Sequence, residues 1–148
     1  MQAAINYDHP IWHTMKVQPL FEDPMVAVCH PGLANEAPES MPLLHKHSSP
    51  YSWARYAKLV GLSLSTGSTG PTYDRYGLLI EAAKAGIGMA LVPGCYVEED
   101  LLGGKLVTPW PTTAQLCERY VLVTRPTTET APTLAKFERW LIDEATAR

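Results

Sequence analysis

The stretch that decides the fold runs from Tyr73 to Pro93 and reads YDRYGLLIEAAKAGIGMALVP. Apolar residues recur within it at the spacing of one helical face, which predicts a helix with a buried stripe. That stripe consists of Leu78, Leu79, Ala82, Ala83 and Ile87. Gly86 and Gly88 predict the end of the helix and the turn after it. Residues 89–92 then form an apolar run of strand length, which ends at Pro93 because proline cannot donate to a sheet.

A helix followed this closely by a buried strand is typical of a parallel βαβ unit. In such sheets the loop that opens the helix lies at the carboxyl edge of the preceding strand, where small ligands bind. The stretch therefore predicts the fold class and also the position of a ligand site.

The rest of the chain alternates strands with helices, which predicts an α/β class with a mixed sheet flanked by helices. Strands are expected at residues 3–7, 17–21, 25–29, 42–45, 105–107 and 119–124, and helices at 95–102 and 131–147. Another helix is expected after Ser52, its predicted N-cap, and is closed by Gly61. The last helix should bury Leu134, Phe137, Trp140 and Leu141 and turn Glu138 and Asp143 to solvent.

Composition narrows the function classes. The 148 residues amount to one domain, and a net charge of -3 offers no electrostatic footprint for nucleic acid. No apolar run approaches the roughly 18 residues that span a bilayer, and the N-terminus lacks a signal-peptide pattern. Cys29, Cys95 and Cys117 fit no zinc or redox spacing. We therefore expect buried, reduced thiols and a cytoplasmic protein.

No enzyme, metal or cofactor site is predicted. Acidic residues such as Asp74 and Glu81 are better explained as helix-terminal charge and as a solvated helix face than as an acid–base pair. The histidine pairs at 9/13 and 45/47 are poor metal sites, because Pro10 follows the first histidine and Lys46 separates the second pair. The serine- and glycine-rich segment 65–70 lacks the ending of a phosphate-binding loop and is interpreted as a connection.

Several motifs, taken in order, match a known family. They are AAINYDHPIW at 3–12, PLFEDPMVAVCHPGL at 19–33, the opening stretch, EEDLLGGKLV at 98–107 and YVLVTRP at 120–126. The chain resembles the effector-binding domain of LysR-type transcriptional regulators, in the branch that includes glycine-cleavage activators and beta-lactamase regulators. The resemblance extends from Ala3 to Ala145.

The resemblance implies two Rossmann-like subdomains joined by two crossing strands, as in type 2 periplasmic binding proteins, with an effector in the cleft. By position, residues 3–7 and 120–125 would be the crossing strands, and about 8–118 the second subdomain. Residues 1–7 and 119–148 would be hinge strands and a remnant of the first. Relatives carry a helix-turn-helix and more of the first subdomain, so 1–148 is expected to be a partial effector-binding domain.

Two consequences follow from this partial domain. The strand at 120–123 and the Phe137/Trp140 stripe are expected to lack their cover, which predicts self-association. The chain is interpreted as a non-catalytic sensing module for a small molecule, such as an amino acid or another carboxylate. The alternative is a stand-alone interaction protein that pairs with itself or with full-length regulators.

The resemblance also implies effector-contacting residues. Asn6, Tyr7 and Trp12 match cleft-lining positions at and after the first crossing strand, although many relatives carry arginine where Asn6 stands. Tyr73, Asp74 and Tyr76 lie at the helix opening, where backbone N–H groups and the helix dipole favour a carboxylate. For Tyr73 and Trp12, ordinary core packing is the alternative.

Overall fold

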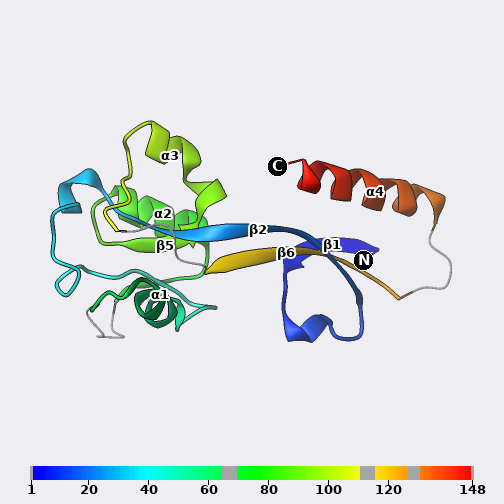
Figure 1. Cartoon of the computed structure of the whole chain (residues 1–148), viewed down its shortest axis with the longest axis horizontal. Coiled ribbons are helices and arrows are strands. Elements are labelled where there is room, and N and C mark those ends of the chain that lie inside the picture. Colours follow the sequence, from blue (N-terminus) through cyan, green and yellow to red (C-terminus); the bar gives the residue numbers. More distant parts are fainter. Residues whose placement is uncertain (1, 65–69, 111–115, 127–130, 148) are drawn as a thin grey trace. The chain divides into compact units, whose positions relative to one another are not determined.

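The computed structural model describes residues 2–64, 70–110, 116–126 and 131–147 (Figure 1). The chain forms two compact units. The first combines Met1–Asp23 with Glu118–Arg148, and the second is Pro24–Cys117. Two strands, β2 (Lys16–Val28) and β6 (Cys117–Thr124), run from one unit into the other. The boundary at Asp23 differs from the one expected near residue 8, because the first half of β2 belongs with the first unit.

The first unit is built on β1 (Ala3–Tyr7), β6 and the first part of β2, with α4 (Pro132–Thr146). Strand β1 pairs antiparallel with β6, from Ala3 opposite Thr124 to Tyr7 opposite Tyr120. In the strand order β6 lies between β1 and β2. Residues 120–123 of β6 are at most 8% exposed. The expectation that this strand lacks cover is therefore wrong.

Strand β2 is one continuous strand of 13 residues, where two strands had been expected. Pro24 lies between the two expected strands, and its missing N–H costs no hydrogen bond in the ladder with β5. The ladder with β5 (Ala90–Pro93) begins only at Met25, whose own N–H donates to the Leu116 carbonyl at 2.7 Å.

In the second unit the chain segment from Leu43 to His47 occupies the centre of a parallel arrangement. On one edge the Leu44 N–H donates to the Met89 carbonyl at 2.9 Å. On the other edge β3 (His45–Lys46) pairs parallel with β4 (Thr72–Tyr73). Helix α2 (Tyr76–Lys84) connects β4 to β5, so the predicted parallel unit is present.

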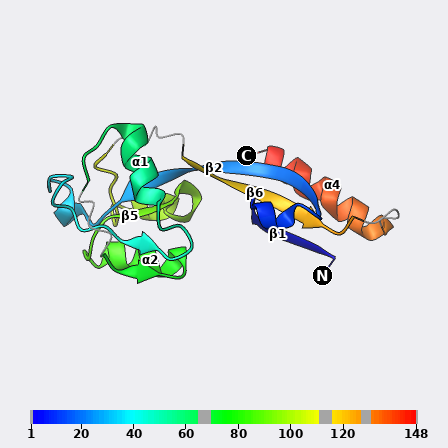
Figure 2. The same cartoon turned by 90° about the horizontal axis from the view of Figure 1, so that it is seen from below.

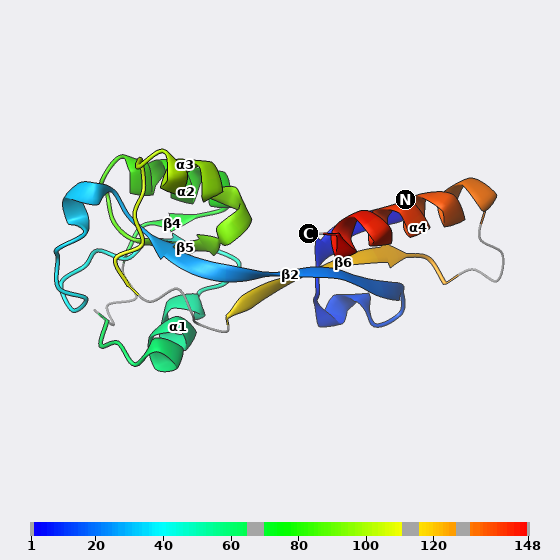
Figure 3. The same cartoon turned by 45° about the horizontal axis from the view of Figure 1, so that its top comes forward.

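Strand β5 also pairs antiparallel with β2, which makes the pairing of the second unit mixed. Helix α1 (Ser52–Val60) and α2 lie on opposite sides of β5 in every view (Figure 2, Figure 3). Strands covered on both sides by helices confirm the predicted α/β class.

Helix α2 buries a slightly different face from the one predicted. Its stripe is Tyr76, Leu79, Ile80 and Ala83, with Ala82 beside it. Leu78 is 55% and Ile87 48% exposed, so their assignment to the core is wrong. Leu78 falls outside the i, i+3, i+4, i+7 series that starts at Tyr76, and Ile87 lies beyond the end of α2 at Lys84.

The helix ends as predicted at a left-handed glycine. Gly86 has φ +77°, its N–H donates to the Ala83 carbonyl at 3.0 Å, and the Ile87 N–H donates to the Ala82 carbonyl at 3.1 Å. These two bonds satisfy carbonyls that the helix end would otherwise leave unpaired.

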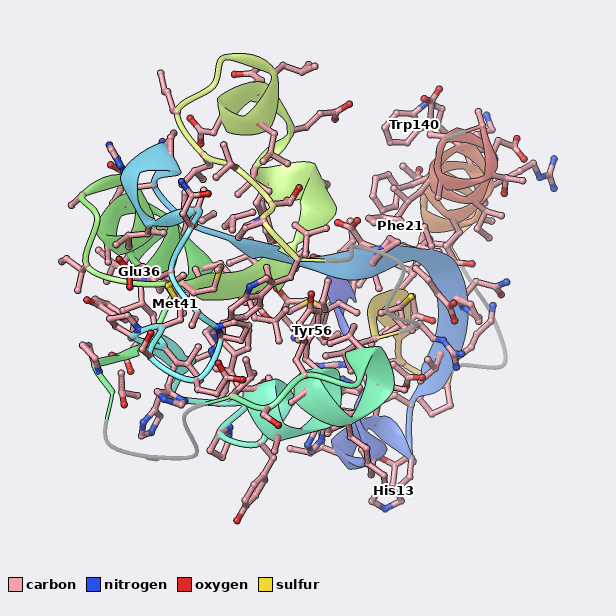
Figure 4. The ribbon with its side chains drawn as sticks, turned by 60° about the vertical axis from the view of Figure 1, so that its left-hand side comes forward. His13, Phe21, Glu36, Met41, Tyr56 and Trp140 are labelled. Atoms are coloured by element: carbon pink, nitrogen blue, oxygen red, sulfur yellow. The ribbon has the colours of Figure 1, made fainter. Side chains whose placement is uncertain are left out.

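The core of the second unit lies between α1 and the strands. Tyr56 is fully buried there (Figure 4). The Trp53 indole N–H donates to the Leu44 carbonyl at 2.8 Å, and its ring lies edge-on to Trp110 at 6.1 Å. Helix α1 ends at Gly61, as predicted. It begins at Ser52, whose hydroxyl donates backwards to the Ser49 carbonyl at 2.8 Å, so the N-cap assignment of Ser52 is wrong.

Four further expectations change. The helix expected at 95–102 is a 3-10 turn, Gly94–Tyr96, followed by α3 (Glu98–Leu102). The strand expected at 105–107 reduces to one bridge between Val107 and Cys29, and that at 42–45 to a bridge at Leu43 and the start of β3. Cys29 is buried, but Cys95 and Cys117 are exposed, contrary to expectation.

Helix α4 matches its predicted span but not its predicted buried stripe. Phe137 is 41% and Trp140 55% exposed, while Leu134 and Leu141 are half-buried. Asp143 faces solvent as predicted. The Glu138 side chain is only 16% exposed and pairs with Lys16 at 3.5 Å. No helix in the described parts of the chain is long and apolar enough to cross a membrane.

Candidate functional site

The six residues predicted to contact an effector fall into two groups, one in each compact unit. Tyr73, Asp74 and Tyr76 belong to the second unit. Asn6, Tyr7 and Trp12 belong to the first.

The second-unit group lies where β4 ends and α2 begins. Tyr73 is half-buried and its carbonyl accepts the His47 N–H at 2.9 Å, so this residue is held in the parallel pairing. Asp74 follows and is exposed. Arg75 is the N-cap of α2 and makes no side-chain capping hydrogen bond.

The beginning of α2 has no cap from the side chain of its N-cap residue. The first N–H groups of a helix have no partner inside it, and they carry the positive end of the helix dipole. A Cβ built on Gly77 would meet nothing within 4 Å. An anionic group could therefore approach this turn, which is the chemistry expected of a carboxylate site.

Tyr76 is a packed residue whose ring is largely covered. Its exposure is 9%, its ring centroid lies 5.8 Å from that of Tyr96, and the Lys46 ammonium lies 5.0 Å from its centroid. Lys46 also donates to the Ser48 hydroxyl at 2.8 Å. The ring therefore holds the start of α2 in place through its packing against Tyr96 and Lys46.

Lys46 is a cation near the helix opening, beside the Tyr76 ring, that the sequence pattern does not reveal. In the sequence it only separates the two histidines of the second pair. The parallel pairing of β3 with β4, in which Lys46 lies opposite Tyr73, brings it to this place. A two-residue strand has too little periodicity to reveal that pairing from sequence.

His45 precedes Lys46 and is partly buried. Its Nε2 atom is buried and has no hydrogen-bond partner among the described residues. Burial lowers the pKa of this imidazole below its ordinary value of 6.5. The described residues contain no group of three histidine, cysteine or acidic side chains that could hold a metal ion.

The first-unit group is held together around the end of β1. The Asn6 side-chain oxygen accepts the Tyr7 N–H at 2.8 Å, and Asn6 is exposed. The Trp12 indole N–H donates to the Tyr7 carbonyl at 3.1 Å. Trp12 is half-buried, so it is anchored by its polar edge while part of its ring remains accessible.

An aromatic cluster supports this group. The Tyr7 ring lies 5.0 Å from Tyr120, which stacks on Phe21 at 4.6 Å between centroids. Next to it, Arg119 pairs with Glu22 at 2.7 Å and with Asp8 at 3.5 Å. The hydrogen bond to Glu22 raises the pKa of Arg119. This guanidinium, which the sequence analysis also missed, is therefore already engaged by two carboxylates.

Comparison with known proteins gives a family match over nearly the whole chain. Residues 1–146 match the family described as "LysR substrate binding domain". The HTH-type transcriptional regulator TrpI of Pseudomonas aeruginosa is 34% identical over 120 residues, covering 74% of this chain and 41% of that protein. The glycine cleavage system transcriptional activator of Escherichia coli is 26% identical over 155 residues, covering 99% of this chain and 50% of that protein. The chain thus spans half or less of the length of these two curated relatives.

Solved structures give the same picture. The effector domain of the transcriptional regulator AmpR of Pseudomonas aeruginosa superposes with a TM-score of 0.82 at 25% identity, covering 99% of this chain and 73% of that one. The AmpR effector-binding domain from Citrobacter freundii gives 0.82 at 26% identity, covering 100% of this chain and 76% of that one.

Proposed function

The chain belongs to the family of LysR substrate-binding domains, and on this basis we propose that it senses a small-molecule effector for a transcriptional regulator without catalysing a reaction. The resemblance predicted from the motifs is confirmed by this match. The relatives named above are transcriptional regulators and activators, and the solved neighbours are effector domains of another transcriptional regulator, AmpR. A cytoplasmic location, which regulators of transcription need, is part of the proposal.

The observation that carries the proposal to particular residues is the open first turn of α2. We assign the effector's carboxylate to the backbone N–H groups of this turn, next to Tyr73 and Asp74, which precede the helix. Space above Gly77 and the absence of a side-chain cap support this assignment.

The residues of the first unit would offer a different set of contacts to a ligand. The exposed Asn6 amide can donate and accept hydrogen bonds, and the accessible part of the Trp12 ring can cover an apolar group. Tyr7 would act mainly by holding Trp12 through its carbonyl. Amino acids, aromatic acids and peptidoglycan fragments are the classes of effector we would test first.

A charge-neutralising pair of variants tests the assignment. Asp74→Asn removes a negative charge next to the proposed carboxylate site, whereas Glu98→Gln makes the same change in net charge on exposed α3. After a thermal-shift screen has identified a binding carboxylate, calorimetry would compare the variants. Asp74→Asn should strengthen carboxylate binding about two- to fivefold, and Glu98→Gln should leave it unchanged. Equal affinities in all three proteins would contradict the assignment, and no shift with any compound would contradict sensing by this chain.

We also propose that the chain self-associates. The exposed aromatic side chains of α4 support this part of the proposal, because large exposed apolar groups on one face mark interaction surfaces. Light scattering after size-exclusion chromatography tests it, and a monomer at high concentration would contradict it.

A further inference from the structure

The outward face of α4 is centred on Trp140. The half-buried residues of the helix, which mark its inward side, are Leu134, Ala135, Glu138, Leu141, Ile142 and Ala145. At 100° per residue, Trp140 points nearly opposite to the middle of that set. It is 55% exposed and its ring stands off the helix (Figure 4).

A second aromatic ring enlarges this surface. Phe137 lies one turn before Trp140, is 41% exposed, and has its ring centroid 6.0 Å from that of Trp140. The two rings therefore form one continuous apolar surface, which we call the Trp140 face. Tryptophan at the centre of a contact surface is among the residues that contribute most to binding.

Charges are distributed unequally along the Trp140 face. Lys136 lies one turn before Trp140, and Glu144 lies one turn after it. Both side chains are exposed, and within the described parts of the chain neither forms an ion pair. The face is thus basic at one end, aromatic in the middle and acidic at the other end.

Such a face is complementary to itself when it is turned around. We propose that two copies of the chain associate through the Trp140 face, with the two α4 helices antiparallel about a twofold axis at Trp140. Lys136 of each copy then faces Glu144 of the other copy, and the aromatic rings meet in the centre. The inference rests on the self-association proposed above and specifies its surface and geometry.

The charges select this orientation over the opposite one. In a parallel pair Lys136 would face Lys136 and Glu144 would face Glu144, and neighbouring like charges on helix surfaces are destabilising. A twofold interface uses the same patch on both copies, so each favourable contact occurs twice. The aromatic centre would supply most of the affinity, and the two ion pairs would set the orientation.

Charge reversal at the two ends gives a sharp test. Lys136→Glu places two acidic groups opposite each other at both ends of the dimer, and Glu144→Lys places two basic groups there. Each variant alone should associate about tenfold more weakly than the original chain. An equimolar mixture should regain the original affinity, because a heterodimer restores both opposite-charge pairs. Sedimentation equilibrium measures the association constants of the original chain, of each variant and of the mixture. Circular dichroism checks that the variants are folded.

Two additional variants complete the experiment. Lys58→Glu makes the same charge change as Lys136→Glu on the exposed side of α1 and should leave association unchanged. Trp140→Ala should abolish measurable association while the fold is retained, since the side chain is mostly exposed.

The outcomes separate the levels of the proposal. A monomeric original chain at several hundred micromolar would overturn self-association altogether. Association that neither reversal weakens, or a mixture that stays as weak as its components, would overturn the Trp140 face and its antiparallel geometry. Effector binding, measured by thermal shift on the same proteins, bears on the sensing proposal alone.

Discussion

Gly88 should tolerate no side chain, because it lies against the backbone of the neighbouring strand segment. A Cβ at Gly88 would lie 2.5 Å from the Pro42 carbonyl oxygen and 3.1 Å from Leu44 Cδ2. Ordinary contact begins at 3.4 Å, so the two backbones would have to separate by about 0.9 Å, the difference between 3.4 and 2.5 Å.

That separation is opposed by the hydrogen bonds on both sides of the contact. The Met89 N–H donates to the Pro42 carbonyl at 2.8 Å, and the Leu44 N–H donates to the Met89 carbonyl at 2.9 Å. Weakening two such bonds costs about 1 kcal/mol each, and overpacking adds about 1–3 kcal/mol. We therefore expect Gly88→Ala to lower the free energy of unfolding by about 3–5 kcal/mol.

Two other glycines of the same stretch provide matched controls. Gly77 lies inside α2 with open space around it, so Gly77→Ala should stabilise the chain by about 0.5–1 kcal/mol. Gly86 has a left-handed backbone at φ +77°, so Gly86→Ala should cost about 1–2 kcal/mol.

Urea unfolding followed by tryptophan fluorescence measures the series. Trp53 and Trp110 are 5% and 8% exposed in the same unit and would report its unfolding. The expected order of stability is Gly77→Ala, original chain, Gly86→Ala and Gly88→Ala. If Gly88→Ala were within 1 kcal/mol of the original chain, the close approach of the two backbones would be refuted.

Three further predictions concern single groups. Ellman's reagent should modify the exposed Cys95 and Cys117 quickly in the folded chain. Cys29 should react only on unfolding, because its thiol is buried and burial raises its pKa. Equally fast reaction of all three thiols would contradict this. The pKa of His45 is lowered in the folded state, so the unfolded chain binds a proton more readily and the free energy of unfolding should fall as pH drops through 6.5. His45→Gln should make this fall smaller, which urea titrations between pH 7.5 and 5.5 would measure. Tyr120→Ala should lower the free energy of unfolding by about 3–5 kcal/mol, because the residue is 8% exposed and its ring stacks on Phe21. Tyr120→Phe should lower it by less than half as much. Equal losses in the two variants would show that the hydroxyl, not the ring, carries the stability.

Elements with a strong local pattern could be predicted from sequence. Strand β1, the span of α4 and the Gly86 helix end follow from apolar periodicity and from the backbone freedom of glycine. The α/β class followed from the order of these elements, and the family resemblance followed from motifs along the chain. Each of these depends on residues close together in the sequence.

The predictions that were wrong concern features set by contacts between residues far apart in the sequence. Two strands were expected on either side of Pro24, but β2 is continuous through it, because the ladder with β5 begins only at Met25. Leu78, Phe137 and Trp140 looked like core residues, yet which face of a helix is buried depends on what packs against it. Composition could not distinguish the buried Cys29 from the exposed Cys95 for the same reason.

The sequence by itself determined the fold class and the family. The tertiary structure alone decided that Lys46 stands beside the Tyr76 ring at the start of α2, that Arg119 is engaged by Glu22 and Asp8, and that Trp140 faces outward. Periodicity and turn chemistry act over a few residues and can be read along the chain. Strand pairing and burial join residues dozens of positions apart, and no local pattern encodes their partners.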